Sequence, residues 1–327
     1  MTAYSDRMQP TVVTTPPLRS QNAIAGVTIL LLSLSVLSVL DASGKWILAA
    51  GVSLLVVTWF RYVIHFLLIL LLLISRRELH LFKSFSLKYQ VMRGATILLT
   101  TMSFFTTLSL LPQAQATTMI FLAPLIILAL APWVLNEPKR ISRWVAAASG
   151  FAGVLVVIRP SAGLDSVGVL FGLLTAALMA IQHLLTRKVA VDHPLTTMLW
   201  SGLIGAVATS LVLPIALPLL EVDWYETLAH LSAWNWAILL SLGLTGAVGH
   251  LLQVQAYRLA AASLLAPFMY LQIIAASALG WWIWSDFPDK LSWVGIGLIC
   301  ASGAVIAWYE WHCSRSQAVC AKTKRPA

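Results

Sequence analysis

The chain has 327 residues, of which 59% are hydrophobic and only 10% charged, and its mean hydropathy is +0.86. A composition this apolar excludes a water-soluble globule and predicts an integral membrane protein with several spans. The net charge of +9 would also suit a nucleic-acid-binding protein, so the positions of the basic residues decide its meaning.

Ten apolar segments follow one another along the chain. A hydrocarbon core of ~30 Å requires about 20 apolar residues per helix, and each segment approaches that length. Transmembrane β-strands would instead alternate between apolar and polar residues, whereas residues 66–73 are continuously apolar. We therefore predict an all-α integral membrane fold of ten transmembrane helices, over residues 23–42, 50–74, 90–111, 114–135, 141–158, 166–186, 195–219, 234–256, 262–284 and 291–311.

Residues of the first half recur in the second half at an offset of 149. The most informative matches are two tryptophans, a glycine and an acidic residue: Trp133, Trp144, Gly94 and Glu137 correspond to Trp282, Trp293, Gly243 and Asp286. Five segments per half would place the second copy upside-down in the membrane, and such inverted repeats are typical of transporters. The expected organisation is a disordered tail (1–20), a first five-helix repeat (21–158), a linker (159–165), a second repeat (166–311) and a basic tail (312–327).

The basic residues gather on one side of this predicted topology. All 21 lysines and arginines except Lys45, Arg61, Arg159 and Lys290 fall in the tails, in alternate connections or at the segment ends next to them, including Arg93 and Arg187. The positive-inside rule then places both termini in the cytoplasm, with the helices in the inner (plasma) membrane. The positive charge thus reports topology, and nucleic acid is not an expected partner.

Two pairs of ionisable residues lie in the first two segments, each with a spacing of four that puts both members on one helix face. Such side chains are costly inside a bilayer and mark functional sites. Arg61 either binds a carboxylate or phosphate of a solute or forms a salt bridge with Asp41. His65 either relays protons or hydrogen-bonds between helices. Asp41 and Lys45 are candidates for gating the outer mouth, with a structural role as the alternative.

A polar stripe follows the eighth segment, where His250, Gln253 and Tyr257 are spaced by three and four residues. Their counterparts at the offset of 149 are Thr101, Phe104 and Leu108, so we expect a cavity that is hydrogen-bonding on one side and largely apolar on the other. Contacts that join the eighth and ninth helices are the alternative interpretation of the stripe.

Proline interrupts the fourth segment of each half. Pro124 and Pro267 each remove a backbone donor, and interrupted helices at corresponding positions indicate a transporter site. Thr117 precedes the first break, and Tyr270 follows the second. Tyr270 and Gln272 fall on different helix faces, and we expect Tyr270 to face the cavity.

Several of these stretches together resemble a known family. Ala266-Pro267-Phe268-Met269-Tyr270-Leu271-Gln272, followed by Leu279-Gly280-Trp281 and Asp286-Phe287-Pro288-Asp289, resembles the ninth helix and following loop of EamA-type members of the drug/metabolite transporter superfamily. Leu135-Asn136-Glu137 is similar to that family's acidic cap after the fourth helix. The resemblance implies a ten-helix carrier in which both halves share a central cavity and work by alternating access.

Metal-ligand, nucleotide-binding and nucleophile motifs are absent from the sequence, so we expect neither an enzyme nor a bound metal or cofactor. The predicted function is secondary transport of a small organic metabolite: an amino acid, a vitamin such as riboflavin, or a nucleoside-like cofactor such as S-adenosylmethionine. A membrane-embedded enzyme or lipid-processing protein that uses the polar stripe, and a passive channel, are the alternatives. Expected partners are the solute and the lipid bilayer, with protons (through His65 or His250) and a second copy of the chain as further candidates.

Overall fold

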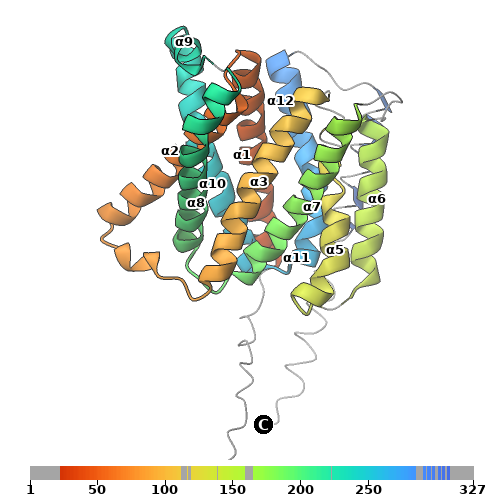
Figure 1. Cartoon of the computed structure of the whole chain (residues 1–327). Coiled ribbons are helices and arrows are strands. Elements are labelled where there is room, and N and C mark those ends of the chain that lie inside the picture. Colours follow the sequence, from red (N-terminus) through yellow and green to blue (C-terminus); the bar gives the residue numbers. More distant parts are fainter. Residues whose placement is uncertain are drawn as a thin grey trace, which may run out of the picture.

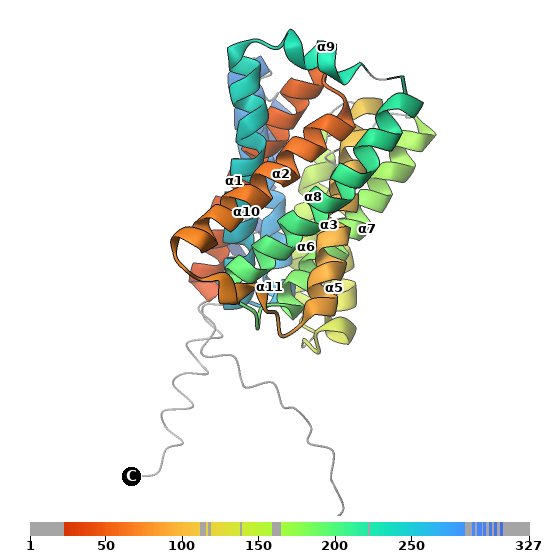
Figure 2. The same ribbon diagram turned by 60° about the vertical axis from the view of Figure 1, so that its left-hand side comes forward.

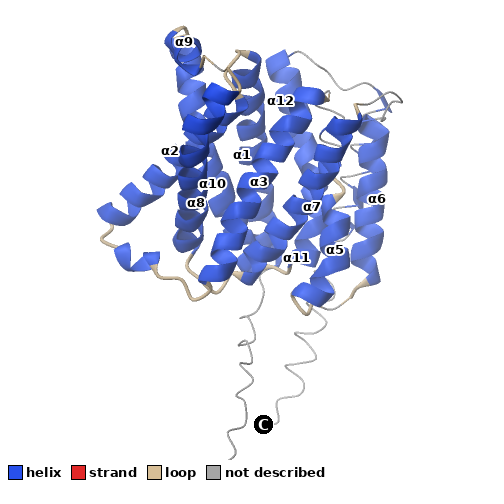
Figure 3. Cartoon of the chain, viewed as in Figure 1, coloured by secondary structure: helices blue, strands red, loops and turns tan. Residues whose placement is uncertain are grey.

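The computed structural model describes residues 23–111, 116, 119–137, 139–158, 165–221, 223–284 and scattered positions between 290 and 309. Within these residues the secondary structure is helical, without a strand (Figure 3). The prediction of an all-α fold is therefore confirmed. Most of the linker 159–165 and both tails fall outside the described residues, whereas the predicted segment 291–311 is described at scattered positions, all of them helical.

The long helices lie side by side in one bundle (Figure 1). Their bounds are α1 Ala23–Ala49, α2 Leu54–Ser75, α3 Leu87–Leu110, α5 Ala123–Val134, α6 Ile141–Ile158, α7 Ser166–Lys188, α8 Pro194–Leu219, α10 Ala233–Leu259 and α12 Gln272–Trp284. Short elements connect them: η1 Leu79–Phe82, α9 Trp224–Ala229, α11 Ala262–Leu265 and the 3₁₀ helix η2 Ala266–Leu271.

Seven helical stretches of the described chain are long and apolar enough to cross a membrane. They are α1, α2, α3, α7, α8, α10 and the continuous stretch Ala262–Ile283, which combines α11, η2 and most of α12. Because a helix satisfies its own backbone hydrogen bonds, each can sit in hydrocarbon without unpaired backbone groups.

Prolines and polar caps set several helix boundaries. Pro124 lies in the first turn of α5, directly after a turn at Phe121 and Leu122, so the fourth apolar segment does not form one continuous helix. Pro267 lies in the first turn of η2, where the ninth segment changes from α to 3₁₀ geometry. Proline is tolerated at such positions because the first turn of a helix needs no backbone donor there.

Helix contacts come in matched pairs. The most extensive interfaces join α1 to α10 and α3 to α7, and the next joins α2 to α8. They are followed by α2 to α10 and α3 to α8, and then by α1 to α12 and α5 to α7. Figure 2 shows α1, α2 and α10 grouped beside the group of α3, α7 and α8.

Glycines let these helices approach closely. A Cβ added to Gly243 of α10 would lie 2.4 Å from Cβ of Ile64 on α2. A Cβ added to Gly94 of α3 would lie 2.8 Å from Cδ1 of Ile204 on α8. The two glycines that match at the offset of 149 therefore make comparable contacts in two comparable interfaces.

Candidate solute cavity

A cavity opens between helices of both halves of the chain, in two overlapping parts that share Asp41, Phe104, Ile120 and Gln272. One part holds about 570 Å³ of empty space, counting the portion open to its surroundings. Its polar lining comes from α1, α2, α3, α7, α10 and α12: Asp41, Arg61, Thr100, Thr101, Thr175, Gln182, His250, Gln253 and Gln272.

A row of hydrogen bonds crosses this part of the cavity. Arg61 of α2 donates from Nη1 to Thr101 Oγ1 at 2.8 Å, and its Nη2 lies 3.1 Å from Nε2 of His250. Because a guanidinium can only donate, Nε2 must accept, and Nδ1 of His250 then carries the hydrogen that is donated to Gln253 Oε1 at 3.3 Å. In this arrangement His250 is a neutral imidazole, and binding a proton at Nε2 would require Arg61 to move away.

Asp41 of α1 supplies the carboxylate of the cavity. Its Oδ2 accepts a hydrogen bond from Gln272 Nε2 at 3.3 Å. The alternative prediction for Arg61, a salt bridge with Asp41, is not realised, because the partners of Arg61 are Thr101 and His250. The cavity therefore presents a guanidinium and a carboxylate that are not bonded to each other.

The predicted polar and apolar asymmetry of the cavity is present in part. Where Arg61 lines the cavity, the second half contributes mostly polar residues, whereas the first half contributes the apolar side chains of Leu37, Leu40, Ile97, Phe104 and Ile120. The first half is nevertheless not wholly apolar, because Asp41, Arg61, Thr100 and Thr101 also line the space. Phe104 lines both parts of the cavity as an apolar wall.

Two predicted tyrosines are buried outside the cavity lining. The Tyr257 ring stacks on His183 with centroids 5.3 Å apart, and its hydroxyl lies 4.0 Å from Sδ of Met269. Tyr270 packs edge-on against Phe121, and its hydroxyl has no hydrogen-bond partner among the described residues. Gln272, two residues after Tyr270, faces the cavity instead. The 3₁₀ turns of η2, with three residues per turn, shift the helix register between these two positions.

The remaining predicted residues also lie away from the lining. His65 is buried near Gly202 of α8, and its Nε2 has no hydrogen-bond partner in the described chain. Lys45 is half-buried, one turn beyond Asp41 on α1, and Thr117 lies outside the described residues. Sequence reasoning missed Gln182, although a glutamine within an apolar segment is a signal of the same kind as Gln253.

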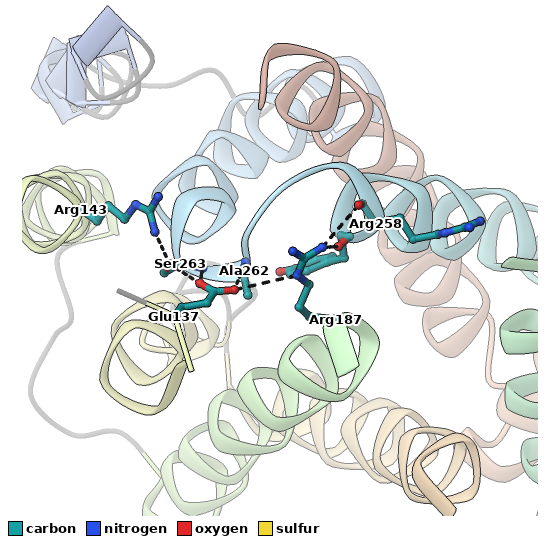
Figure 4. Close-up of polar contacts among 7 residues, drawn as sticks. Glu137, Arg143, Arg187, Arg258, Ala262 and Ser263 are labelled. Carbon is teal, nitrogen blue, oxygen red and sulfur yellow. Dashed lines mark hydrogen bonds and ion pairs between the residues drawn. The ribbon is translucent and has the colours of Figure 1, made fainter. Parts of the chain in front are cut away.

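Away from the cavity, at one end of the bundle, Glu137 joins the end of α5 to the start of α11 (Figure 4). Its two carboxylate oxygens accept hydrogen bonds from the backbone N–H groups of Ala262 and Ser263, both at 3.0 Å, and from the Ser263 hydroxyl. Arg143 of α6 donates to the same hydroxyl oxygen.

Arg187 ties α7 and α10 to this group. Its Nε lies 4.0 Å from Oε1 of Glu137, and its Nη1 donates to the carbonyl of Tyr257 at 2.6 Å, with a longer contact of 3.4 Å to that of Arg258. We call Glu137, Arg143, Arg187 and Ser263 the closure network, because these four side chains connect four helices and one loop at this end.

Comparison with known proteins accounts for this architecture. The model of the EamA-like transporter family matches residues 166–308. The chain thus matches the EamA-like transporter family over its second half, in agreement with the resemblance seen in the sequence. It is thus a multi-pass membrane transporter and not an enzyme, as predicted.

Individual relatives of the transporter are distant. It is 27% identical over 220 residues to the S-adenosylmethionine uptake transporter of Rickettsia prowazekii, covering 67% of this chain and 71% of the relative. It is 26% identical over 213 residues to a pseudopaline exporter of Pseudomonas aeruginosa, covering 64% and 71%. A solved crystal structure superposes with a TM-score of 0.71 at 19% identity over 89% of this chain and 99% of that chain, which shows a shared fold.

Proposed function

We propose that the transporter is a secondary carrier, which binds a small organic solute in the cavity and exposes it alternately to the two sides of the membrane. The observation that carries this proposal is the row Thr101, Arg61, His250 and Gln253, which stands opposite Asp41 inside a bundle of membrane-spanning helices. Polar groups at such positions are costly in a bilayer, and a solute that they bind explains their presence.

We further propose ten helices in two inverted five-helix repeats, with both termini in the cytoplasm. Exchanging α1 with α7, α2 with α8, α3 with α10, and α5 with α12 leaves the set of major interfaces unchanged. The matching approaches of Gly94 to Ile204 and Gly243 to Ile64 support the same exchange. Rocking of one repeat against the other would then open the cavity first at one end and then at the other.

The closure network holds one end of this cavity shut. On one side of Phe104, the cavity continues past Leu108 and Leu279. On the other side, a layer that contains His183 and Tyr257 separates the cavity from the closure network. In the proposed cycle the bonds of Glu137 break before a solute can leave past Arg187.

The charges of the cavity favour a zwitterionic solute. Arg61 matches a carboxylate, and Asp41 matches an ammonium or sulfonium group, so an amino acid or an S-adenosylmethionine-type cofactor would satisfy both. A neutral vitamin such as riboflavin would offer neither Arg61 nor Asp41 a group of opposite charge. The name of the Rickettsia relative, which refers to S-adenosylmethionine, agrees with a solute that carries an amino-acid group.

Counterflow in sealed proteoliposomes tests the proposal, with labelled S-adenosylmethionine as the probe. We expect saturable exchange of unchanged solute, a loss of affinity of about tenfold or more in Arg61→Gln, and a similar loss in Asp41→Asn. Arg76→Gln, on the exposed end of the same helix, is the matched control and should exchange like the wild type. Non-saturating flux would support a channel, and a chemically altered product would support an enzyme; either result would overturn the carrier.

A further inference from the structure

A second group of buried polar side chains lies between the cavity and the closure network. Arg93 of α3, His183 of α7 and Tyr257 of α10 are all fully buried. Each lies four residues from a residue that lines the cavity, namely Ile97, Met179 and Gln253. Four residues are about one helical turn, so these three side chains form a layer directly beneath the cavity.

Arg93 in this layer has only partial compensation for its charge. Its Nε donates to Thr186 Oγ1 at 2.8 Å, and its Nη1 donates to Ser201 Oγ. Both hydroxyls already donate to backbone carbonyls of their own helices, at 2.7 Å each, so they face the guanidinium as neutral acceptors. Nη2 has no hydrogen-bond partner, and no carboxylate of the described chain forms an ion pair with Arg93.

His183 adds further unsatisfied groups to the same place. It lies three residues before Thr186 on α7 and so shares the helix face that meets Arg93. Both ring nitrogens lack hydrogen-bond partners among the described residues, while the ring itself stacks on Tyr257. Buried polar groups are normally hydrogen-bonded, so two neighbouring unsatisfied groups indicate a missing partner.

We propose that Arg93 and His183 form a second binding station, which receives the anionic group of the solute on its way between the cavity and the closure network. A carboxylate, phosphate or sulfonate fits because its several oxygens can accept from Nη2 of Arg93 and from a ring N–H of His183 at once. This inference rests on the proposed carrier function. It adds that the anionic group passes from Arg61 to Arg93, one helical turn closer to the closure network.

Charge-selective thiol reagents test this station without any knowledge of the solute. In a background in which Cys300, Cys313 and Cys320 are replaced by serine, Thr186→Cys places a thiol beside Arg93. The full-length protein in proteoliposomes is treated with a sulfonate-bearing and with a trimethylammonium-bearing methanethiosulfonate of similar size. We expect the anionic reagent to react about tenfold faster than the cationic one or more, because a buried positive charge concentrates anions.

The control removes the charge and keeps the hydrogen-bonding side chain. When Arg93→Gln is combined with Thr186→Cys, the preference for the anionic reagent should disappear. If Thr186→Cys folds poorly, Ser201→Cys on α8 takes its place and should show the same preference with Arg93 present. Equal rates with Arg93 present, a faster cationic reaction, or no reaction at either cysteine would show a sealed structural charge and overturn the station. S-adenosylmethionine counterflow is measured on the same vesicles, so failure of the carrier function is seen separately from failure of the station.

Discussion

Replacement of Glu137 by glutamine should destabilise the closed end of the bundle, and the size of this effect follows from the hydrogen bonds of Glu137. The carboxylate accepts three hydrogen bonds, and its side chain is only 9% exposed, so water cannot easily replace them. Hydrogen bonds to a charged group contribute about 1.5–3 kcal/mol each. Glutamine keeps one acceptor oxygen but turns an amide donor toward backbone donors. The Arg187 contact, at 4.0 Å, adds little.

We therefore expect Glu137→Gln to destabilise the closed end by about 2 kcal/mol, which corresponds to a shift of about 30-fold in the equilibrium between closed and open ends. The assay follows a single cysteine at Ala266→Cys, a fully buried position one turn inside Ser263, in the background with the three native cysteines replaced. A membrane-impermeant maleimide applied from the closure-network face should label it roughly 10 to 30 times faster in Glu137→Gln.

The matched control is Asp223→Asn, which makes the same chemical change in the cap of α9, at the opposite end of the bundle (Figure 1). Its labelling rate should equal that of the parent protein. If Glu137→Gln lowers the thermal stability but leaves the labelling rate unchanged, the closure network is a permanent brace and our reasoning about its opening is wrong.

Three further outcomes are expected from stability measurements. Gly205→Ala should lower the free energy of unfolding by about 1–3 kcal/mol, because the added Cβ would lie 2.2 Å from Cδ1 of Tyr62. Gly280→Ala should be neutral or stabilising, because nothing lies within 4 Å of its added Cβ. Equal melting temperatures of the two variants would contradict the packing. Tyr270→Phe should change stability by less than about 1 kcal/mol, because its hydroxyl has no partner in the described chain, and a large loss would reveal one. Asp192→Ala should cost about 2–4 kcal/mol, because this buried carboxylate accepts from the Ser84 and Gln90 side chains and from a backbone N–H; a neutral result would show that water replaces it.

Some site residues could be found without coordinates, because the free-energy cost of placing them in a bilayer depends only on the apolar segment around them. A charged or strongly polar side chain inside an apolar segment is conspicuous in any sequence, and Arg61, His250 and Gln253 were selected in this way. The structure places all three in the cavity lining. Gln182 carries the same signal and was missed.

Other residues could not be placed from the sequence. Arg93 was counted with the charges of the cytoplasmic side, since it stands near the start of an apolar segment, yet it is fully buried between α3, α7 and α8. Tyr270 and Gln272 fall on different helix faces, and only the packing of the helices shows that the face with Gln272 lines the cavity.

The sequence by itself determined that this protein is helical, that it is a membrane protein, and where seven stretches long and apolar enough to cross a membrane lie. The physical reason is that a helix in hydrocarbon satisfies its backbone internally and needs only a long enough run of apolar residues. Only the tertiary structure decided that Arg61 bonds to His250 instead of Asp41, and that Glu137 holds the start of α11. Those contacts join residues between 125 and 189 positions apart, and their geometry depends on how the helices pack against one another.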